Sequence, residues 1–280
     1  MNHEFENGNA KIASHDGAAM HTLAQVPTSV TLSAEQFEKL YLSPLNRRQP
    51  EMTKKLGNPT PLGLGAFILT ATPLACCLMG WRGAGGEGAA FSGVLVLFGG
   101  LLLVVSSILE FILGNTFSCV VFGQLGAFCL AFGATMTPAF NATAPYSTSG
   151  TNGVEGLHSA GFVNTYAFFF LAMAMLMFVY MLCASRTNAV YVAIFFSLII
   201  FFSLAAAAYW HLGAGNMELG DRLVVGSGGT LFFTSLCGWY IFSAQLLASV
   251  GFPLPLPLGD LSHLWNQQKT GGGDVESVME

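Results

Sequence analysis

Six apolar segments, each about as long as a membrane-spanning helix, dominate this sequence. A helix needs about 20 consecutive apolar residues to cross a bilayer, and a scan for such runs predicts six spans. Their limits are 62–80, 91–112, 116–136, 161–184, 189–210 and 223–248. Glu110, near one end of the second span, is the only Asp, Glu, Lys or Arg inside these limits. The pattern predicts an all-α integral membrane protein with six transmembrane helices.

The composition excludes an ordinary soluble domain. Of the 280 residues, 53% are hydrophobic and only 9% are charged, whereas charged residues make up about 25% of a typical soluble domain. The mean hydropathy is +0.59. The sequence also has no Gly-x-Ser-x-Gly motif, no P-loop and no His-Glu-x-x-His motif. We therefore expect no enzyme and no cofactor.

The two ends of the chain are polar and flank the apolar part. We predict a cytoplasmic tail at 1–57, a transmembrane domain at 58–250 and a second cytoplasmic tail at 251–280. Within the first tail, the apolar residues from Leu32 to Leu42 fall near one helical face, which fits a short amphipathic helix as well as an unstructured segment. The first 30 residues have no apolar core of a signal peptide, so we expect no cleaved signal.

Positive charges beside the spans predict the orientation in the membrane. One side carries Arg47, Arg48, Lys54, Lys55, Arg186 and Lys269, and the other carries Arg82 and Arg222. Because loops rich in Lys and Arg stay in the cytoplasm, both termini are predicted to be cytoplasmic. The loop at 137–160 is then outside, and it contains an acceptor sequon for N-glycosylation at Asn141.

Neither the cysteines nor the charged residues near the fifth span have the spacing of a metal site. All six cysteines lie inside predicted spans, where we expect each to pack in an apolar environment: Cys76, Cys77, Cys119, Cys129, Cys183 and Cys237. His211, Glu218, Asp221 and Arg222 are expected to form a solvated outer loop.

Three asparagines precede the first helix of each predicted hairpin, at Asn58, Asn115 and Asn188. Asn caps helix starts well, and we favour this simple interpretation for Asn188. A ring of helix N-termini also attracts a small anion without a lysine or arginine. For Asn58 and Asn115 both interpretations stay open.

Glu110 lies four residues before Gly114 and Asn115, near this predicted anion vestibule. An ionisable residue at the end of a span either reaches the interface or has a function. The carboxyl group is predicted to accept a hydrogen bond from an Asn or a Thr, or to couple transport to protons. The sequence does not choose between these roles.

Small residues recur on the second and third spans, and membrane helices that pack closely have this pattern. The residues concerned are Ser92, Gly93, Gly99, Gly100, Gly123, Gly126, Ala127 and Gly133. Close packing of this kind leaves flat faces that favour association of subunits, so we expect an oligomer.

Several motifs in the same order resemble those of the acetate uptake transporter family. They are Asn-Pro-Thr-Pro-Leu-Gly-Leu at 58–64 with Phe67, Glu110, Gly-Asn-Thr-Phe at 114–117, Gly-Asn at 215–216 and Pro-Leu-Gly-Asp-Leu-Ser at 257–262. This family includes bacterial succinate/acetate permeases and fungal ammonia/acetate transporter-like proteins. The resemblance extends from about Asn58 to Asp260.

The resemblance implies a hexamer in which each protomer has its own pore for acetate and related monocarboxylates. It also implies a narrow constriction at Phe67, Leu125 and Leu198. The family has a Tyr where this chain has Leu125, so a hydroxyl that can bond a carboxylate is missing. A second departure is Thr60, where the family motif usually has Ala.

We predict a substrate vestibule formed by Asn58, Thr70, Glu110, Asn115 and Thr116. The helix starts and Glu110 suggest this vestibule, and the resemblance adds Thr70. Thr70 is predicted either to donate to the carboxylate or to bond back to its own helix. We therefore predict transport of acetate-like monocarboxylates across the plasma membrane, by a channel or by proton symport. The alternatives are export of ammonium or ammonia, and an acetate-responsive membrane sensor or scaffold with little transport.

Overall fold

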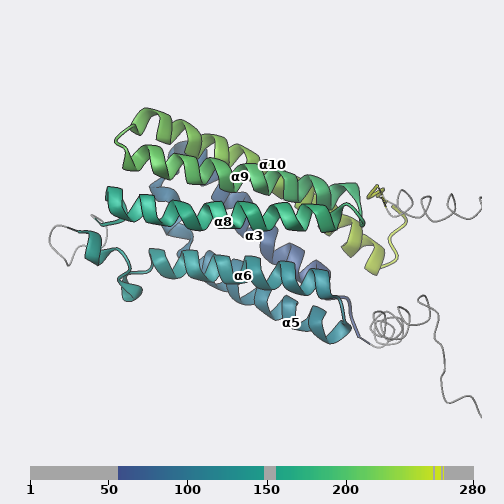
Figure 1. The fold of residues 1–280 in the computed structure, drawn as a ribbon. Helices are drawn as coiled ribbons and strands as arrows, with labels where there is room; N and C mark the ends of the chain where they lie inside the picture. The colour runs from purple at the N-terminus through teal and green to yellow at the C-terminus, as the bar shows by residue number, and fades with distance from the viewer. Residues whose placement is uncertain (1–55, 148–155, 255, 260, 262–280) are drawn as a thin grey trace, which may run out of the picture. The chain divides into compact units, whose positions relative to one another are not determined.

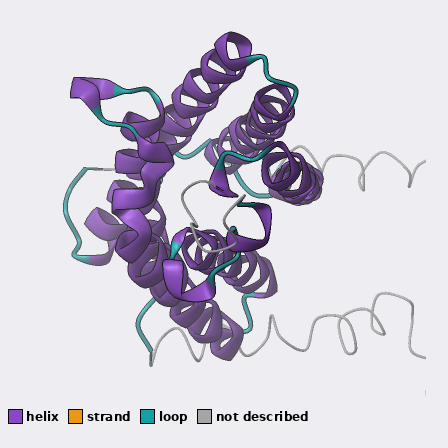
Figure 2. Ribbon diagram, turned by 90° about the vertical axis from the view of Figure 1, so that its left-hand side faces the viewer, coloured by secondary structure: helices purple, strands orange, loops and turns teal. Residues whose placement is uncertain are grey.

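The structure, a computed structural model, describes residues 56–147, 156–254, 256–259 and 261, and these ranges contain helices and no strand (Figures 1 and 2). Within them, six helices are long and apolar enough to cross a membrane. Five are single α-helices and the second is composite. The bounds are α3 Thr60–Leu78, the composite of α4 Ser92–Val94, η4 Leu95–Leu102 and α5 Leu103–Leu113, α6 Thr116–Met136, α8 Ala160–Ala184, α9 Ala189–Gly213 and α10 Met217–Ser249. The predicted all-α membrane fold with six spans is confirmed.

The connections between the helices lie at the two ends of the bundle. Those from α6 to α8 and from α9 to α10 are at one end, on the left in Figure 1, and those from α5 to α6 and from α8 to α9 are at the other. Short 3-10 turns occur at η2 Trp81–Gly83, η3 Gly86–Phe91, η5 Pro138–Phe140 and η6 Ala144–Tyr146. We call the end that holds the start of α3 the inner end and the opposite one the outer end.

The helices pack around a shared interior. α8 packs on α9, α9 on α10 and α10 on α3, while η4 and α5 contact both α3 and α6. Aromatic side chains join α6 to α8, because Phe128 lies 5.6 Å from Phe169 and Phe132 lies 6.2 Å from Phe170 between ring centroids. The view in Figure 2 shows the helices around this interior.

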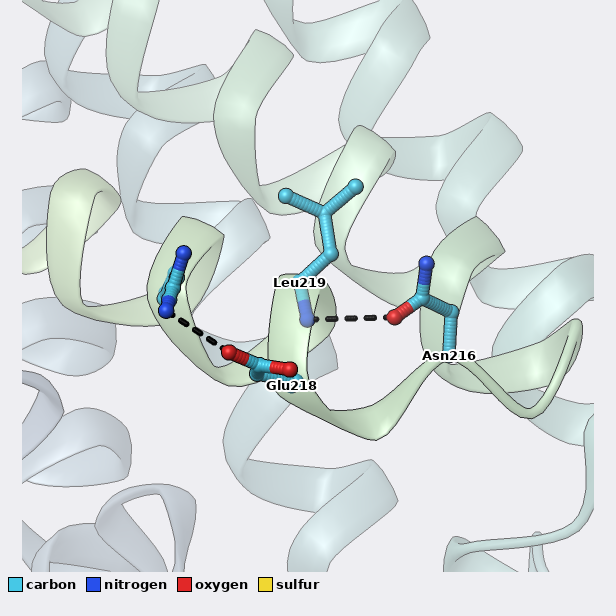
Figure 3. Close-up of polar contacts among 4 residues, drawn as sticks. Asn216, Glu218 and Leu219 are labelled. Carbon is cyan, nitrogen blue, oxygen red and sulfur yellow. Dashed lines mark hydrogen bonds and ion pairs between the residues drawn. The ribbon is translucent and has the colours of Figure 1, made fainter.

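The start of α10 differs from the prediction by six residues. It begins at Met217, because the side chain of Asn216 accepts a hydrogen bond from the Leu219 amide at 3.3 Å, as Figure 3 shows. Arg222 donates to Glu218 at 2.7 Å one turn apart, which also favours a helix here. The expected outer loop is therefore wrong for Glu218, Asp221 and Arg222, which belong to α10.

His211 was expected in the same loop and lies instead in the last turn of α9. The helix continues past this residue to Gly213. A polar side chain at the end of a span reduces the local hydropathy but does not end the helix. The helix ends where the backbone hydrogen bonds stop and the chain turns. Here the Ala214 amide still donates to the Trp210 carbonyl at 3.0 Å, and Gly215 has the positive φ of 80° that turns the chain.

The second span contains a π-helix at Leu95–Leu102 that hydropathy does not predict. A Cβ on Gly99 would lie 2.9 Å from both Thr70 Cγ2 and Cys129 Sγ. The segment therefore passes very close to α3 and α6. π-turns inside α-helices are frequent at functional sites.

Some predictions fall outside the described residues or are wrong. The possible amphipathic helix at 32–42 lies outside them, as do residues 1–55 and 262–280 of the predicted tails. All six cysteines are free, but Cys77 alone among them is buried and Cys183 is exposed on α8. The expected buried packing is thus wrong for Cys183, whose side chain is exposed on the surface of the protomer.

Candidate functional site

Three cavities follow one another along the bundle, in the order in which α3 and α9 pass them. Counted from the inner end, Phe67 on α3 borders the first and second cavities, and Leu78 borders the second and third. On α9, Leu198 borders the first and second, and Leu212 lies on the third. Since a helix rises about 1.5 Å per residue, the two borders on α3 are about 16 Å apart. The cavities are therefore stacked along the helix axes.

The middle cavity, which we call the central chamber, has a volume of about 80 Å³ and an almost entirely apolar wall. Pockets that hold drug-sized ligands are larger, at about 300–1,000 Å³, so this chamber suits a small solute. All six spans contribute to its wall. The lining residues include Phe67, Thr70, Leu74, Leu78, Leu95, Gly99, Leu103, Leu125, Phe128, Cys129, Phe132, Phe170, Leu198, Phe202, Tyr209, Val224, Ser227 and Leu231.

The inner cavity, of about 30 Å³, lies between α3, α6 and α9 on the inner side of the chamber. It shares Phe67, Leu125 and Leu198 with the chamber. These are the three predicted constriction residues, and the structure brings them together where the two cavities meet. Leu125 and Leu198 are buried. Their role as a gate stays a prediction.

The outer cavity, of about 330 Å³, is more polar. Its wall includes His158 before α8, Asp221 on α10 and the glycine-rich turn at 80–86 after α3. It shares Leu78 and Val224 with the chamber. The outer cavity is therefore separated from the chamber by apolar side chains, as the inner one is.

A hydrogen-bond network around Glu110 joins three helices at the inner end. The side chain of Glu110 is fully buried, and its Oε1 accepts a hydrogen bond from Thr60 Oγ1 at 2.5 Å. Its Oε2 accepts one from Asn115 Nδ2, also at 2.5 Å. A buried carboxyl group needs such partners, because an unsatisfied one costs several times what a hydrogen bond contributes. The hydrogen bonds predicted for Glu110 are thus present, while its part in proton coupling stays a prediction.

The three asparagines differ in what their side chains do. Asn188 caps α9, since its Oδ1 accepts from the Tyr191 amide at 3.0 Å. Asn58 is exposed, and its Oδ1 accepts from the Thr60 amide at 3.0 Å. Asn115 makes no side-chain cap of α6, and its Nδ2 donates to Glu110. The cap interpretation therefore holds for Asn188 and is wrong for Asn115. Asn58 is not the N-cap of α3 either, because that position is Pro59, and Asn58 bonds the first turn from one residue further out.

Two hydroxyl groups in the central chamber, those of Thr70 and Ser227, bond back to their own helices. Thr70 Oγ1 donates to the Ala66 carbonyl at 2.9 Å, which is the second of the two alternatives for this residue. Ser227 Oγ likewise donates to the Val224 carbonyl at 2.7 Å. Each hydroxyl carries a single proton, so both present acceptor lone pairs to the chamber. Thr116, the last vestibule candidate, is exposed at the start of α6 and lines none of the three cavities.

Sequence reasoning missed most of the aromatic wall of the chamber. Phe128 stacks on Phe132 with ring centroids 6.0 Å apart and meets Phe202 edge to face at 5.1 Å. The spacing of Phe128 and Phe132, four residues apart on α6, indicates a shared face and was a usable signal. Leu78 and Val224 carry no such signal, because apolar residues are ordinary in a membrane span.

The fold and the stacked cavities define a multi-pass helical membrane protein with a row of internal cavities, an architecture that fits channels and transporters. The chain belongs to the GPR1/FUN34/yaaH family, whose profile matches residues 42–262. The resemblance inferred from the motifs is confirmed.

Curated relatives and a solved structure agree with this assignment. Protein alcS of Aspergillus fumigatus is 59% identical over 264 residues, which cover 94% of this chain and 97% of that protein. Acetate transporter protein patA of Aspergillus clavatus is 32% identical over 210 residues, covering 75% of this chain and 81% of the relative. The bacterial acetate channel SatP superposes with a TM-score of 0.55 over 72% of this chain and 99% of its own, at 22% identity, and this likeness shows the fold.

Proposed function

We propose that the protein moves acetate and related small monocarboxylates across the plasma membrane, through a path inside each protomer. The observation that carries the proposal is the central chamber of about 80 Å³, which all six spans build and which meets a further cavity at each end. Its size suits a solute of a few heavy atoms. The names of patA and SatP as acetate transporter and acetate channel support this substrate class.

Phe67, Leu125 and Leu198 form the gate of this path. They line both the chamber and the inner cavity, and a ring of apolar side chains holds back water and ions. Taking a carboxylate out of water without a partner is costly, so such a gate favours the neutral acid or a brief opening. The vestibule lies at the inner end, where Glu110 fixes the helix starts and the exposed Asn58 and Thr116 meet the solute.

Both termini lie in the cytoplasm in this proposal, and the protein is a hexamer with one path per protomer. Arg186 lies at the inner end between α8 and α9, as the distribution of positive charge requires. The sequon residue Asn141 is exposed at the other end, after η5. A glycan at Asn141 that a glycosidase removes supports the orientation. Reaction of an Asn141→Cys variant with a thiol reagent supplied only from the cytoplasmic side contradicts it.

The test is uptake of radiolabelled acetate into sealed vesicles that contain the purified protein, with and without an imposed proton gradient. Uptake along the acetate gradient alone indicates a channel, and uptake that needs the proton gradient indicates symport. Phe67→Ala is expected to change the rate and the acetate selectivity. The matched control is Phe168→Ala on α8, whose side chain is exposed on the helix surface and lines no cavity. Absence of uptake by the natural protein contradicts the proposal.

Export of ammonium or ammonia is the second candidate. Thr70 and Ser227 offer acceptor lone pairs to the chamber, because both hydroxyl protons go to helix carbonyls. A solute with N–H donors matches this wall. The same vesicles, loaded with ammonium and a pH-sensitive dye, separate the two candidates: ammonia movement without acetate uptake favours the second.

A further inference from the structure

At its outer end, as at its inner end, the central chamber shares apolar residues with a neighbouring cavity. The chamber and the outer cavity share two residues, Leu78 on α3 and Val224 on α10. Both side chains are apolar and half-buried. A solute that enters from the outer cavity therefore meets them before it reaches the chamber, as one from the inner cavity meets Phe67, Leu125 and Leu198.

Two glycines of α10 fix the helix against α3 at these two levels. A Cβ on Gly228 would lie 2.9 Å from Leu78 Cβ and 3.1 Å from the Ala75 carbonyl oxygen, so the two backbones are in contact at the outer level. A Cβ on Gly238 would lie 2.6 Å from Ile68 Cγ2 and 3.7 Å from the ring of Phe67, at the inner level. The two contacts are ten residues apart on α10, which is about 15 Å along the helix. Each narrow place is therefore supported by close helix packing, against the α3 backbone at Gly228 and against α3 side chains at Gly238.

We infer that Leu78 and Val224 form a second, outer gate, and that the central chamber is a binding compartment for one small monocarboxylate between two gates. The inference rests on the proposed function for the identity of the solute. It adds that permeation crosses two apolar barriers in series, one at each end of the chamber. A variant that widens one barrier leaves the other in place. A double variant is therefore expected to increase permeation by more than the product of the two single effects.

The first test does not depend on transport. Cys129 lines the chamber and is a free thiol. Purified protein in lipid nanodiscs is exposed to methanethiosulfonate ethylammonium, a water-soluble thiol reagent, and modification of the peptide that contains Cys129 is followed by mass spectrometry. We expect slow modification in the natural protein. Leu78→Ala and Val224→Ala are each expected to raise the rate about tenfold, which corresponds to a barrier lower by about 1.4 kcal/mol.

Matched controls separate the gate from general loosening of the bundle. Leu69→Ala makes the same change on α3 at an exposed position that lines no described cavity, and Val225→Ala makes the same change as Val224→Ala at a residue that lines the outer cavity alone. Both controls are expected to leave the modification rate of Cys129 unchanged. Phe67→Ala opens the inner end and shows that the assay responds to a widened gate. Acceleration by Phe67→Ala, with none by Leu78→Ala or Val224→Ala, would overturn the outer gate.

The second test measures uptake of butyrate relative to acetate in vesicles. Two barriers in series predict that Phe67→Ala and Val224→Ala each raise this ratio modestly and that the double variant raises it by more than the product of the single effects. A double variant that equals Phe67→Ala alone contradicts the inference. If the natural protein takes up neither acid but Cys129 labelling follows the expected pattern, the proposed solute is wrong while the two-gate chamber stands.

Discussion

Glu110 is a fully buried carboxyl group that accepts hydrogen bonds from two other helix starts, through Thr60 on α3 and Asn115 before α6. Leaving a buried acceptor without its partner costs about 1–3 kcal/mol. Thr60→Val keeps the shape of the side chain and removes the donor, so we expect it to lower the stability by about this amount. Thr60→Ser retains the hydroxyl and is the matched control. The measurement is the temperature at which the detergent-solubilised protein loses its chromatographic peak, and equal temperatures for the two variants contradict the prediction.

Leu125 is the proposed gate residue at which this chain departs from the family pattern. It is buried where the chamber meets the inner cavity of about 30 Å³, which leaves little room for a larger side chain. We expect Leu125→Tyr to narrow the gate and to reduce propionate uptake more than acetate uptake. Leu125→Met has similar volume and is expected to keep the natural ratio of the two rates. A higher propionate to acetate ratio in Leu125→Tyr would show that the tyrosine does not narrow the path.

Side-chain contacts within one helix turn could be predicted from the sequence. Contacts with residues far away in the sequence could not. Asn188 caps its helix because a cap needs only the next turn of backbone. Asn115 has the same local context, yet the carboxyl group of Glu110 takes its amide. The grouping of Phe67, Leu125 and Leu198 came from the family resemblance, since no local rule relates three residues on separate helices.

At the level of helices, the contact between α10 and α3 depends on glycine. A Cβ on Gly238 would lie 2.6 Å from Ile68 Cγ2, whereas one on Gly229 would meet nothing within 4 Å. Gly238→Ala is therefore expected to destabilise the protein by about 1–3 kcal/mol. Gly229→Ala is expected to be neutral or to stabilise by up to about 1 kcal/mol, because alanine favours a helix. Thermal stability in detergent measures both, and equal losses for the two variants would contradict a specific contact at Gly238.

The six spans were predictable because apolar length is a strong signal, but the helix details were not. The π-helix at Leu95–Leu102 keeps the hydropathy of an α-helix, so no sequence window reveals it. The start of α10 was missed for the opposite reason. Its first turns carry Glu218, Asp221 and Arg222, which a search for apolar runs excludes although capping and an ion pair make them helical.

For the whole molecule, the number of spans constrains the topology more firmly than the charges do. Six crossings in the described part of the chain put the start of α3 and the end of α10 on the same side of the membrane. The choice of side rests on the positive-inside rule and on the sequon at Asn141. The path itself was beyond sequence analysis, because a cavity is what packing leaves unfilled between all six helices.

Deletion of the N-terminal tail distinguishes a transporter from an acetate-responsive sensor. Among the residues that the structure describes, those that line the three stacked cavities lie between Leu64 and Leu231. If the protein is a pore, deletion of residues 1–50 is expected to leave acetate uptake into vesicles within about twofold of the full chain, a change below about 0.4 kcal/mol in barrier. If it is a sensor with little transport, vesicles of the full chain take up no acetate, and the deletion abolishes the response of cells to acetate. Loss of uptake on deletion, together with normal folding, would contradict a path formed by the six spans alone.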